Sequence, residues 1–455
     1  MSDKHTHDLT RGPIVPTLMR FSLPFLGSSL LQFLYGVVDM VVVGRFSDSA
    51  GIAAVNNSSQ VMQLVTSLIC GIATGGTVLI GQYIGARRDR EAGRTVGNMI
   101  LLFALLAALI TGALLALGNG MVTLMQVPEE AVAPARAYLR ICGCGTVFIV
   151  GYNVVSSILR GIGDSKRPMY FIAISCLLNI FGDLLLVGGF KMGAAGAAVA
   201  TVAAQAVSFL CALITLCRSG LPFPVKVKAQ RQKLLKVLQL GVPVALQDMM
   251  ATLSFIIITV VVNLIGLEQS AAVGVVERLI GFAMVIPVAF MSALAVFAAQ
   301  NMGAGNRDRA RRGMWLSIAV SLGLTLFFFG AMELIPSLLM QIFTTDPAVI
   351  HHGVLYLRTY SIDTLMVCLV FCMNGFFSGC GHTGFTMFNC LFATFAVRVP
   401  LVIWFASWPG VTMLQIGIAA PVASAVQILI QLAYYRTGRW SRSILTEAGE
   451  KGALL

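Results

Sequence analysis

Seven charged residues lie inside long apolar segments, where a charge is costly and usually marks a functional position. They are Asp39, Asp183, Asp248, Glu277, Arg278, Asp363 and Arg398. Asp39 and Asp183 each precede the end of their own segment by about five residues. At a helical rise of 1.5 Å per residue, both are expected roughly 7–8 Å below the same rim. Two carboxylates at one depth predict a site for a cation or a proton.

Three further polar residues are expected in the layer of the two acids. Asn179 is one helical turn from Asp183, Tyr35 is one turn from Asp39, and Thr201 lies at a similar depth in its own segment. Oxygen ligands of this kind suit a hard cation such as Na⁺. Equally, two carboxylates in a low-dielectric site repel, so one of them would hold a proton. A set of isolated helix–helix hydrogen bonds is the purely structural alternative.

The second half of the chain offers different chemistry. Asp248, Glu277 and Asp363 are acidic, and Arg398 could neutralise one of them in a buried ion pair, for example Asp363. A free Glu277 beside a cleft would instead attract cationic molecules. Pro24 and Pro243 each stand early in an apolar segment, where proline kinks a helix. Such a bend could be the moving part of the molecule, or it could simply let long helices pack.

The elements that position these residues are membrane helices. Hydrophobic residues make up 57% of the 455 residues and charged residues only 11%, whereas soluble domains are roughly a quarter charged. The apolar segments are too long for barrel strands, which leaves helices. We predict an all-α polytopic membrane protein with about twelve spans. They are expected at roughly 15–43, 52–82, 96–117, 138–159, 169–187, 194–216, 234–265, 271–299, 315–343, 356–377, 386–406 and 417–435.

The net charge of +12 follows the predicted topology. Of the 31 Lys and Arg residues, 24 fall in loops on one predicted side and five on the other. This bias places both termini in the cytoplasm and argues against a nucleic-acid partner. The cysteines are mostly inside apolar segments and are expected to pack, and the histidines lie in the tail or loops. We expect no cofactor.

An internal repeat divides the chain into two related halves. Gln-Tyr-Ile-Gly-Ala at 82–86 recurs as Gln-Asn-Met-Gly-Ala at 300–304, a shift of 218. Tyr-Leu-Arg at 138–140 recurs at the same shift, and Gly-Ile-Gly at 161–163 is matched there by Gly-Cys-Gly at 379–381. Arg-Asp-Arg at 88–90 and Pro24 recur at a shift of 219. A shared offset indicates duplication. We predict two pseudo-symmetric six-helix bundles with a cleft between them. The expected boundaries are an N-lobe at 1–217, a cytoplasmic linker at 218–236 and a C-lobe at 237–455.

These features resemble the multidrug and toxic compound extrusion (MATE) family over essentially the whole chain. The first half is similar to the DinF-like branch, whose cation site uses a helix-1 Asp, a helix-5 Asn-x-x-x-Asp and a helix-6 Thr. The matching positions here are Asp39, Asn179, Asp183 and Thr201. Tyr35 and Asn153 match polar positions of that family's N-lobe cavity, and Ser156 stands where the family often has Asn. The NorM-like branch has acids in helices 7 and 10, but Asp363 is about one turn displaced, so that site is not carried over.

The resemblance implies efflux of small organic, often cationic and aromatic, compounds, driven by inward Na⁺ or H⁺ with alternating access between the lobes. We expect a monomer in a bacterial inner membrane, with Pro24, Asp248, Glu277, Asp363 and Arg398 as candidates for the substrate cavity or its gating. A major facilitator is one alternative, but its loop signature is one residue shorter than the segment at 85–94. A lipid-linked oligosaccharide flippase is another, although it would have a strongly cationic cavity. A membrane-embedded enzyme lacks support, because no DDxxD, HExxH or catalytic Cys/His pair is apparent and the loops are too short to hold a catalytic domain.

Overall fold

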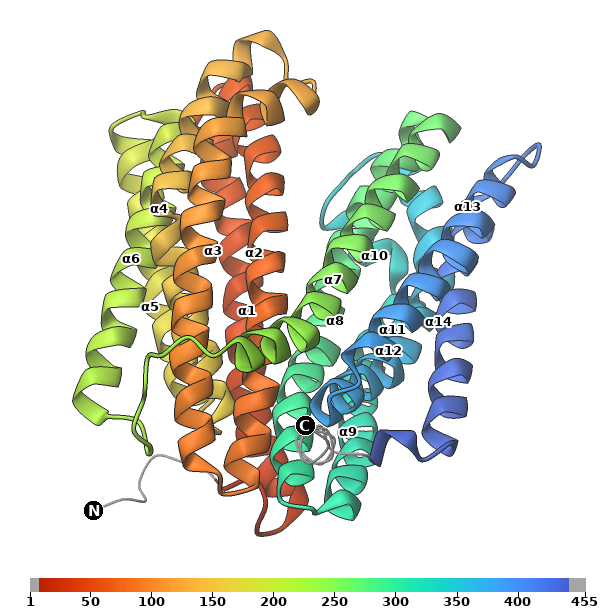
Figure 1. Ribbon diagram of the computed structural model, residues 1–455. Coiled ribbons are helices and arrows are strands. Elements are labelled where there is room, and N and C mark those ends of the chain that lie inside the picture. The colour runs from red at the N-terminus through yellow and green to blue at the C-terminus, as the bar shows by residue number, and fades with distance from the viewer. Residues whose placement is uncertain (1–7, 442–455) are drawn as a thin grey trace. The chain divides into compact units, whose positions relative to one another are not determined.

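The computed structural model describes residues 8–441, and the regular elements in that range are all helices (Figure 1). Twelve helical stretches are long and apolar enough to span a membrane, which confirms the predicted fold class. Ten of them are single helices: α1 (Ile14–Phe46), α2 (Ser49–Gly85), α3 (Asp89–Leu124), α4 (Glu129–Gly161), α6 (Gly193–Ser219), α7 (Arg231–Ile265), α8 (Leu267–Gly303), α9 (Arg307–Leu334), α11 (Pro347–Cys380) and α14 (Met413–Arg436).

The fifth and eleventh spans are interrupted by π-helical turns. The fifth joins α5 (Lys166–Asp183) to η1 (Leu184–Gly189). The eleventh joins α12 (Thr383–Leu391), η2 (Phe392–Arg398) and α13 (Val399–Ala406). Two short helices, α10 (Pro336–Gln341) and η3 (Arg439–Ser441), complete the described elements.

Side chains next to the helix ends determine where several spans begin. Asp48 caps α2 by accepting the Gly51 N–H at 2.8 Å, and Asp346 caps α11 by accepting the Ala348 N–H at 2.9 Å. These oxygens pair with N–H groups that have no partner within the first helical turn. Gly163 and Gly381, equivalent residues of the repeat, have φ values of 91° and 97°, in a region that favours glycine. The repeat therefore preserves the same turn after α4 and after α11.

The chain folds into two compact units. The boundaries between them at 26/27 and 245/246 lie inside helices α1 and α7. Within residues 8–441, the first unit contains Asp8 and Gly27–Ala245, and the second contains Leu9–Leu26 and residues 246–441. Consequently α1 and α7 each contribute one part to each unit, and we call them the shared helices. Pro24 and Pro243 lie within three residues of the two division points. The packing units thus have other boundaries than the lobes expected from the repeat, which were placed at 217/218 and 236/237. Those lobe boundaries remain a prediction.

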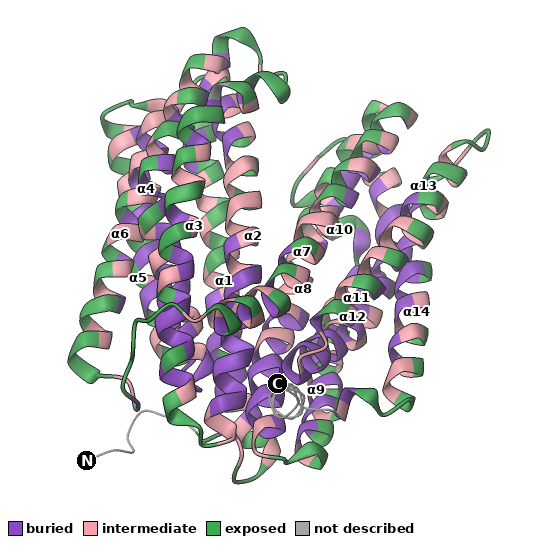
Figure 2. Ribbon diagram, in the orientation of Figure 1, coloured by how far each residue is buried: buried purple, intermediate pink, exposed green. Residues whose placement is uncertain are grey.

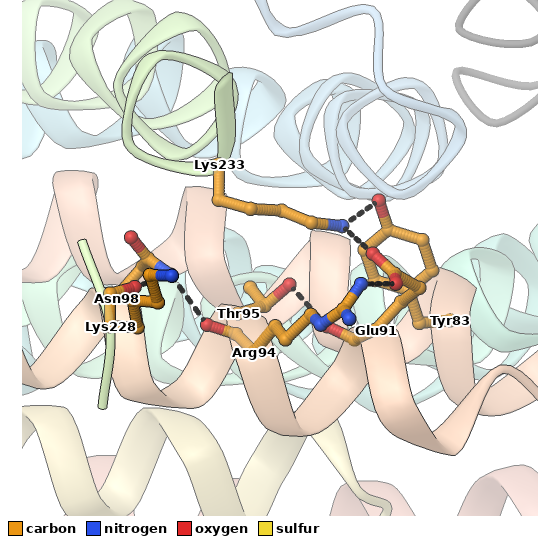
Figure 3. A network of polar contacts seen from close by, with 7 residues as sticks. All are labelled: Tyr83, Glu91, Arg94, Thr95, Asn98, Lys228 and Lys233. Carbon is orange, nitrogen blue, oxygen red and sulfur yellow. Dashed lines mark hydrogen bonds and ion pairs between the residues drawn. The ribbon is translucent and has the colours of Figure 1, made fainter. Parts of the chain in front are cut away.

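In the first unit, the segment before α7 lies along α3. A Cβ atom on Gly93 or Gly97 would collide with the carbonyl oxygens of Pro224 and Lys226, so the glycines allow a close backbone approach. Asn98 then accepts the Gln230 N–H at 2.7 Å and donates to the Lys228 carbonyl at 3.1 Å (Figure 3). The expected linker at 218–236 is therefore docked on the first unit.

The beginning of α7 is held by Lys233. Its Nζ donates to the Tyr83 hydroxyl at 2.5 Å and pairs with Glu91 at 2.7 Å, and Glu91 also pairs with Arg94 at 2.6 Å (Figure 3). Further along the helix, Gly71 of α2 allows the α7 backbone to approach closely at Ala245. These contacts bind the first part of α7 to the first unit.

The second unit holds the segment before α1 in an equivalent way. The Leu9 N–H donates to Gln300 Oε1 at 3.4 Å, and Asn301 Nδ2 donates to the Leu9 carbonyl at 3.2 Å. Arg309 donates to the carbonyls of Gly12 at 2.6 Å and Arg11 at 2.8 Å. Gln300 and Asn301 repeat Gln82 and Tyr83, so each Gln-x-x-Gly-Ala segment belongs to the surface that receives the start of a shared helix.

The duplication is also visible in the packing inside each unit. In the first unit, a Cβ on Gly161 would lie 3.1 Å from the Thr77 carbonyl oxygen and from Ile80. In the second, a Cβ on Gly379 would meet the Ala295 carbonyl oxygen and, at 2.8 Å, Ala298. All three positions in the second set lie 218 residues after those in the first. In both units, buried residues gather in the later parts of α2 and α8 (Figure 2).

Candidate cation site and its counterpart

Asp39 and Asp183 meet inside the first unit. Asp39 comes from the later part of α1, and Asp183 is the last residue of α5. Their carboxyl groups are within hydrogen-bonding reach of each other. Asp183 is fully buried, and the Oδ1 atom of each acid is buried without a hydrogen-bond partner in the part of the chain that the structure describes. Two facing carboxylates repel unless a proton or a cation lies between them.

Asn179 and Thr201 extend the acid pair into a polar network. With the Asn179 amide oriented by its neighbours, its nitrogen donates to Asp183 Oδ2 at 2.8 Å and its oxygen accepts from Thr201 Oγ1 at 3.2 Å. The Tyr35 hydroxyl lies 3.5 Å from the same Thr201 oxygen. The structure therefore brings together all five residues that the sequence places in one layer. Which ion they bind, if any, stays a prediction.

The backbone of α5 brings these side chains close to α6. A Cβ on Gly182 would lie 2.9 Å from the Ala200 Cβ, so the glycine allows the two helices to approach. Directly after Asp183 the helix widens into η1, where the Phe190 N–H bonds to the Leu185 carbonyl at 2.9 Å, five residues earlier. Single π-turns of this kind are frequent at functional sites.

The other candidates of the first half lie apart from this network. Asn153 accepts from Cys70 Sγ at 3.3 Å and donates to the Ile149 carbonyl at 2.8 Å within α4. Ser156 is buried one turn further along α4. Pro24 lies in the part of α1 that belongs to the second unit. The two hydrogen bonds of Asn153 thus lead to α2 and to its own helix, not to the acid pair.

Sequence reasoning missed one neighbour of the acid pair. Tyr138 of α4 is buried and lies within electrostatic range of Asp39, Asp183 and Tyr35. It is the first residue of the repeated Tyr-Leu-Arg motif, so its equivalent in the second half is Tyr356. The motif was a sufficient signal for a shared role, but only the packing shows which residues it faces.

The second unit contains a different polar cluster. Asp363 of α11 accepts a hydrogen bond from the Ser424 hydroxyl of α14 at 2.5 Å. Arg398, the last residue of η2, donates instead to the Tyr360 hydroxyl at 3.0 Å. No ion pair within 4.0 Å joins Arg398 to a carboxylate among residues 8–441. The suggested ion pair between Arg398 and Asp363 is therefore wrong, because each group has a different partner.

Aromatic rings and two further acids surround Arg398. Its guanidinium carbon lies 4.6 Å from the centre of the Phe255 ring and 5.6 Å from that of Tyr360. Glu277 of α8 lies within electrostatic range of Arg398. Asp248 of α7 and Arg398 both lie within electrostatic range of Cys390. The candidates Asp248, Glu277, Asp363 and Arg398 thus gather in one region of the second unit.

Comparisons with known proteins identify related sequences in both halves of the chain. The MatE family model matches residues 24–185 and again residues 243–404, so it recognises both halves. "Probable multidrug resistance protein YpnP" of Bacillus subtilis (strain 168) is 27% identical over 435 residues, covering 95% of this chain and 97% of that protein. "Probable multidrug resistance protein NorM" of Thermotoga maritima is 26% identical over 452 residues, with 94% of each chain covered.

A solved structure shares the fold. It is described as the outward-facing conformation of a multidrug resistance MATE family transporter, with a TM-score of 0.91, 22% identity, and 96% and 99% of the two chains covered. At this identity the likeness concerns the fold alone. Together with the two matches of the family model, one in each half, these observations show that the chain belongs to the MatE family.

Proposed function

We propose that this protein is an efflux carrier, not an enzyme, that exports small organic compounds in exchange for an inward-moving H⁺ or Na⁺. The observation that carries the proposal is the facing pair of Asp39 and Asp183, in which each carboxyl group retains one buried oxygen without a donor. Neither acid forms an ion pair with a basic side chain in the described residues. The names of the relatives support export of drug-like molecules.

The proposed mechanism uses one site that can hold either charge-neutralising species. A proton would bridge the two carboxyl groups directly. A Na⁺ ion would use oxygen ligands from Asp39, Asn179, Asp183 and Thr201. Binding removes the repulsion between the acids, and the conformation of α1 changes near Pro24. Export follows if the ion and the substrate prefer different conformations, since coupling requires differential affinity of each ligand for the two states.

The chain's setting is part of the same proposal. We infer that it lies in a bacterial inner membrane as a monomer. Both termini are placed in the cytoplasm, because basic residues concentrate in the loops on that predicted side. In this orientation the acid pair lies nearer the external end of α1, so the driving ion enters from outside. Organic cations with aromatic rings are the first substrates to test.

The decisive experiment measures ethidium and norfloxacin efflux under an imposed Na⁺ gradient and then under an imposed pH gradient. The gradient that drives efflux identifies the ion. Asp39→Asn should abolish gradient-driven efflux, because the amide cannot share a proton with Asp183 and supplies no charge for Na⁺. Undiminished efflux by a folded Asp39→Asn variant would refute the proposal.

Asp48→Asn is the matched control. Asp48 caps the neighbouring helix α2 through its side-chain oxygen, and asparagine caps helices equally well. This variant also removes one carboxylate from the first unit but leaves the acid pair intact, so it should transport like the unaltered protein.

A further inference from the structure

Arg398 is a cation on a membrane span that is held by aromatic rings instead of by an acid. Its guanidinium lies over Phe255 and beside Tyr360, and among residues 8–441 it makes one hydrogen bond, to the Tyr360 hydroxyl at 3.0 Å. Contacts of this kind stabilise a guanidinium without neutralising it. The charge is therefore retained at a depth where an unpaired cation is costly.

The nearby acids do not account for this cation. Asp363 is hydrogen-bonded to Ser424 at 2.5 Å, and both Asp363 and Glu277 interact with Arg398 through space without a direct contact. A guanidinium carries five N–H donors in a planar fork, so one hydrogen bond leaves most of them available. Arg398 is half-buried, so part of the residue is open to its surroundings.

The backbone at Arg398 is specialised as well. The residue ends the π-helical segment η2, and the corresponding span of the first half carries η1 directly after Asp183. In the first unit the wide turn adjoins the proposed ion site. A wide turn that ends at a cation with no ion pair within 4.0 Å in the described residues is consistent with a ligand site in the second unit.

We propose that Arg398 binds the anionic group, a carboxylate or a phosphate, of an aromatic substrate, with the Phe255 ring contacting the aromatic part. The planar fork fits two oxygen atoms of one oxyanion, a match that an ammonium group lacks. Glu277, beside Arg398, would accept a positive group of the same molecule, so zwitterions fit best. This inference rests on the proposed function, since it names a substrate class for the carrier.

The test uses two pairs of fluorescent probes, each differing in one anionic group. Rhodamine 19 and its ethyl ester rhodamine 6G differ in a carboxylate, and flavin mononucleotide and riboflavin differ in a phosphate. Binding to the purified full-length protein is measured by fluorescence anisotropy. Arg398→Gln should weaken binding of the anionic member of at least one pair by about tenfold, while its partner changes less than about twofold. The pair that responds identifies the anion.

Two further variants keep the test decisive if Arg398→Gln does not fold. Arg398→Lys keeps the charge but not the fork, and should weaken binding of the responding anion by an intermediate factor. Phe255→Leu removes the ring and should weaken both members of that pair similarly. Arg358→Gln, which alters an exposed arginine of α11, is the control and should leave all four affinities unchanged.

Equal losses for both members of each pair in folded Arg398 variants would overturn the inference, because they would indicate a structural role. This failure is distinguishable from failure of the proposed function. Binding is measured without any gradient, so a protein that binds the anions through Arg398 but does not transport would support the site and refute the carrier. Gradient-driven efflux of ethidium by a protein whose Arg398 variants bind both members of each probe pair alike would support the carrier and refute the anion site.

Discussion

The fifth and eleventh spans are equivalent elements of the repeat that carry opposite charges. Both contain a π-helical turn, η1 after Asp183 and η2 ending at Arg398. In the first unit, an acid faces a second acid and no basic side chain pairs with either in the described residues. In the second unit, a base lies over aromatic rings, and the acid Asp363 is held by a hydroxyl group.

This difference shows that the duplicated halves diverged in their charged side chains and in the position of the irregular turn, since η1 corresponds to residues 402–407 and η2 spans Phe392–Arg398. Asp183 corresponds to Leu401, and Arg398 corresponds to Ile180, under the shift of 218. Both charged residues therefore correspond to an apolar residue in the other half. Each of the two spans has a π-helical turn at its own position, and the kind of ligand is specific to each. Exchanging the two pairs of residues tests this division of roles.

The largest effect is expected from Asp183→Leu, which gives the first unit the residue of the second. Removing one carboxylate leaves Asp39 without its partner and Asn179 without its acceptor, so gradient-driven efflux should fall to the level of vesicles without protein. The measurement is ethidium efflux from proteoliposomes under the gradient that drives the unaltered protein. Leu401→Asp added to this variant should not restore efflux, because position 401 lacks a second acid. Restoration would show that the two halves are interchangeable.

A smaller effect is expected from Arg398→Ile, which gives the second unit the residue of the first. Binding of the responding anionic probe should weaken by about tenfold, as for Arg398→Gln. The dependence of ethidium efflux on the driving ion should stay unchanged, because the acid pair is intact. Titrating the ion against the efflux rate checks this point. A shifted ion dependence would contradict the separation of the two sites.

Thr201→Val should have a milder effect that is confined to the first unit. Valine keeps the shape of threonine but removes the hydroxyl group that contacts Asn179 and Tyr35. Loss of one hydrogen bond of this kind should raise the ion concentration needed for half-maximal efflux by about fivefold. Thr215→Val is the control, since this hydroxyl lies about four turns further along α6 and donates to the Cys211 carbonyl of its own helix. Equal shifts in both variants would argue against a role in ion binding.

The smallest effect is expected at the docking contacts of α7. Lys233→Met removes the ion pair with Glu91 and the bond to Tyr83, but Glu91 keeps its pairing with Arg94. We expect a loss of about 1 kcal/mol in stability, visible as a lower midpoint of thermal unfolding. The affinities of the four fluorescent probes should remain unchanged. A change in anion affinity would link this end of the molecule to the site at Arg398.

The sequence predicted the features that depend on local pattern. The twelve spans follow from hydropathy, and the equivalence of the halves follows from the repeated motifs. Depth counting along helices was enough to bring Asp39, Asn179, Asp183 and Thr201 into one layer, because helical rise is regular. Each of these conclusions needs only the periodicity of a helix and the thickness of a membrane.

Other features depend on tertiary packing and could not be predicted in this way. The residues of η1, Leu184–Gly189, are ordinary apolar residues with no signal for a wide turn. The sequence suggested Asp363 as a partner for Arg398, whereas in the structure its partners are Tyr360 and Phe255. Likewise, no local pattern shows that α1 and α7 are each divided between two units, because hydropathy identifies spans but not their neighbours.

The shared helices also constrain the order in which the chain can fold during synthesis. Leu9 is made before its hydrogen-bond partner Gln300, which follows 291 residues later. At 5–20 residues per second, that interval is about 15–60 s. Until then the beginning of α1 lacks its final packing surface, and the first unit is incomplete until α7 has begun to emerge. Each unit needs a helix that begins in the other half of the chain, so the first unit should reach its final packing only after the beginning of α7 is made, and the second unit later still.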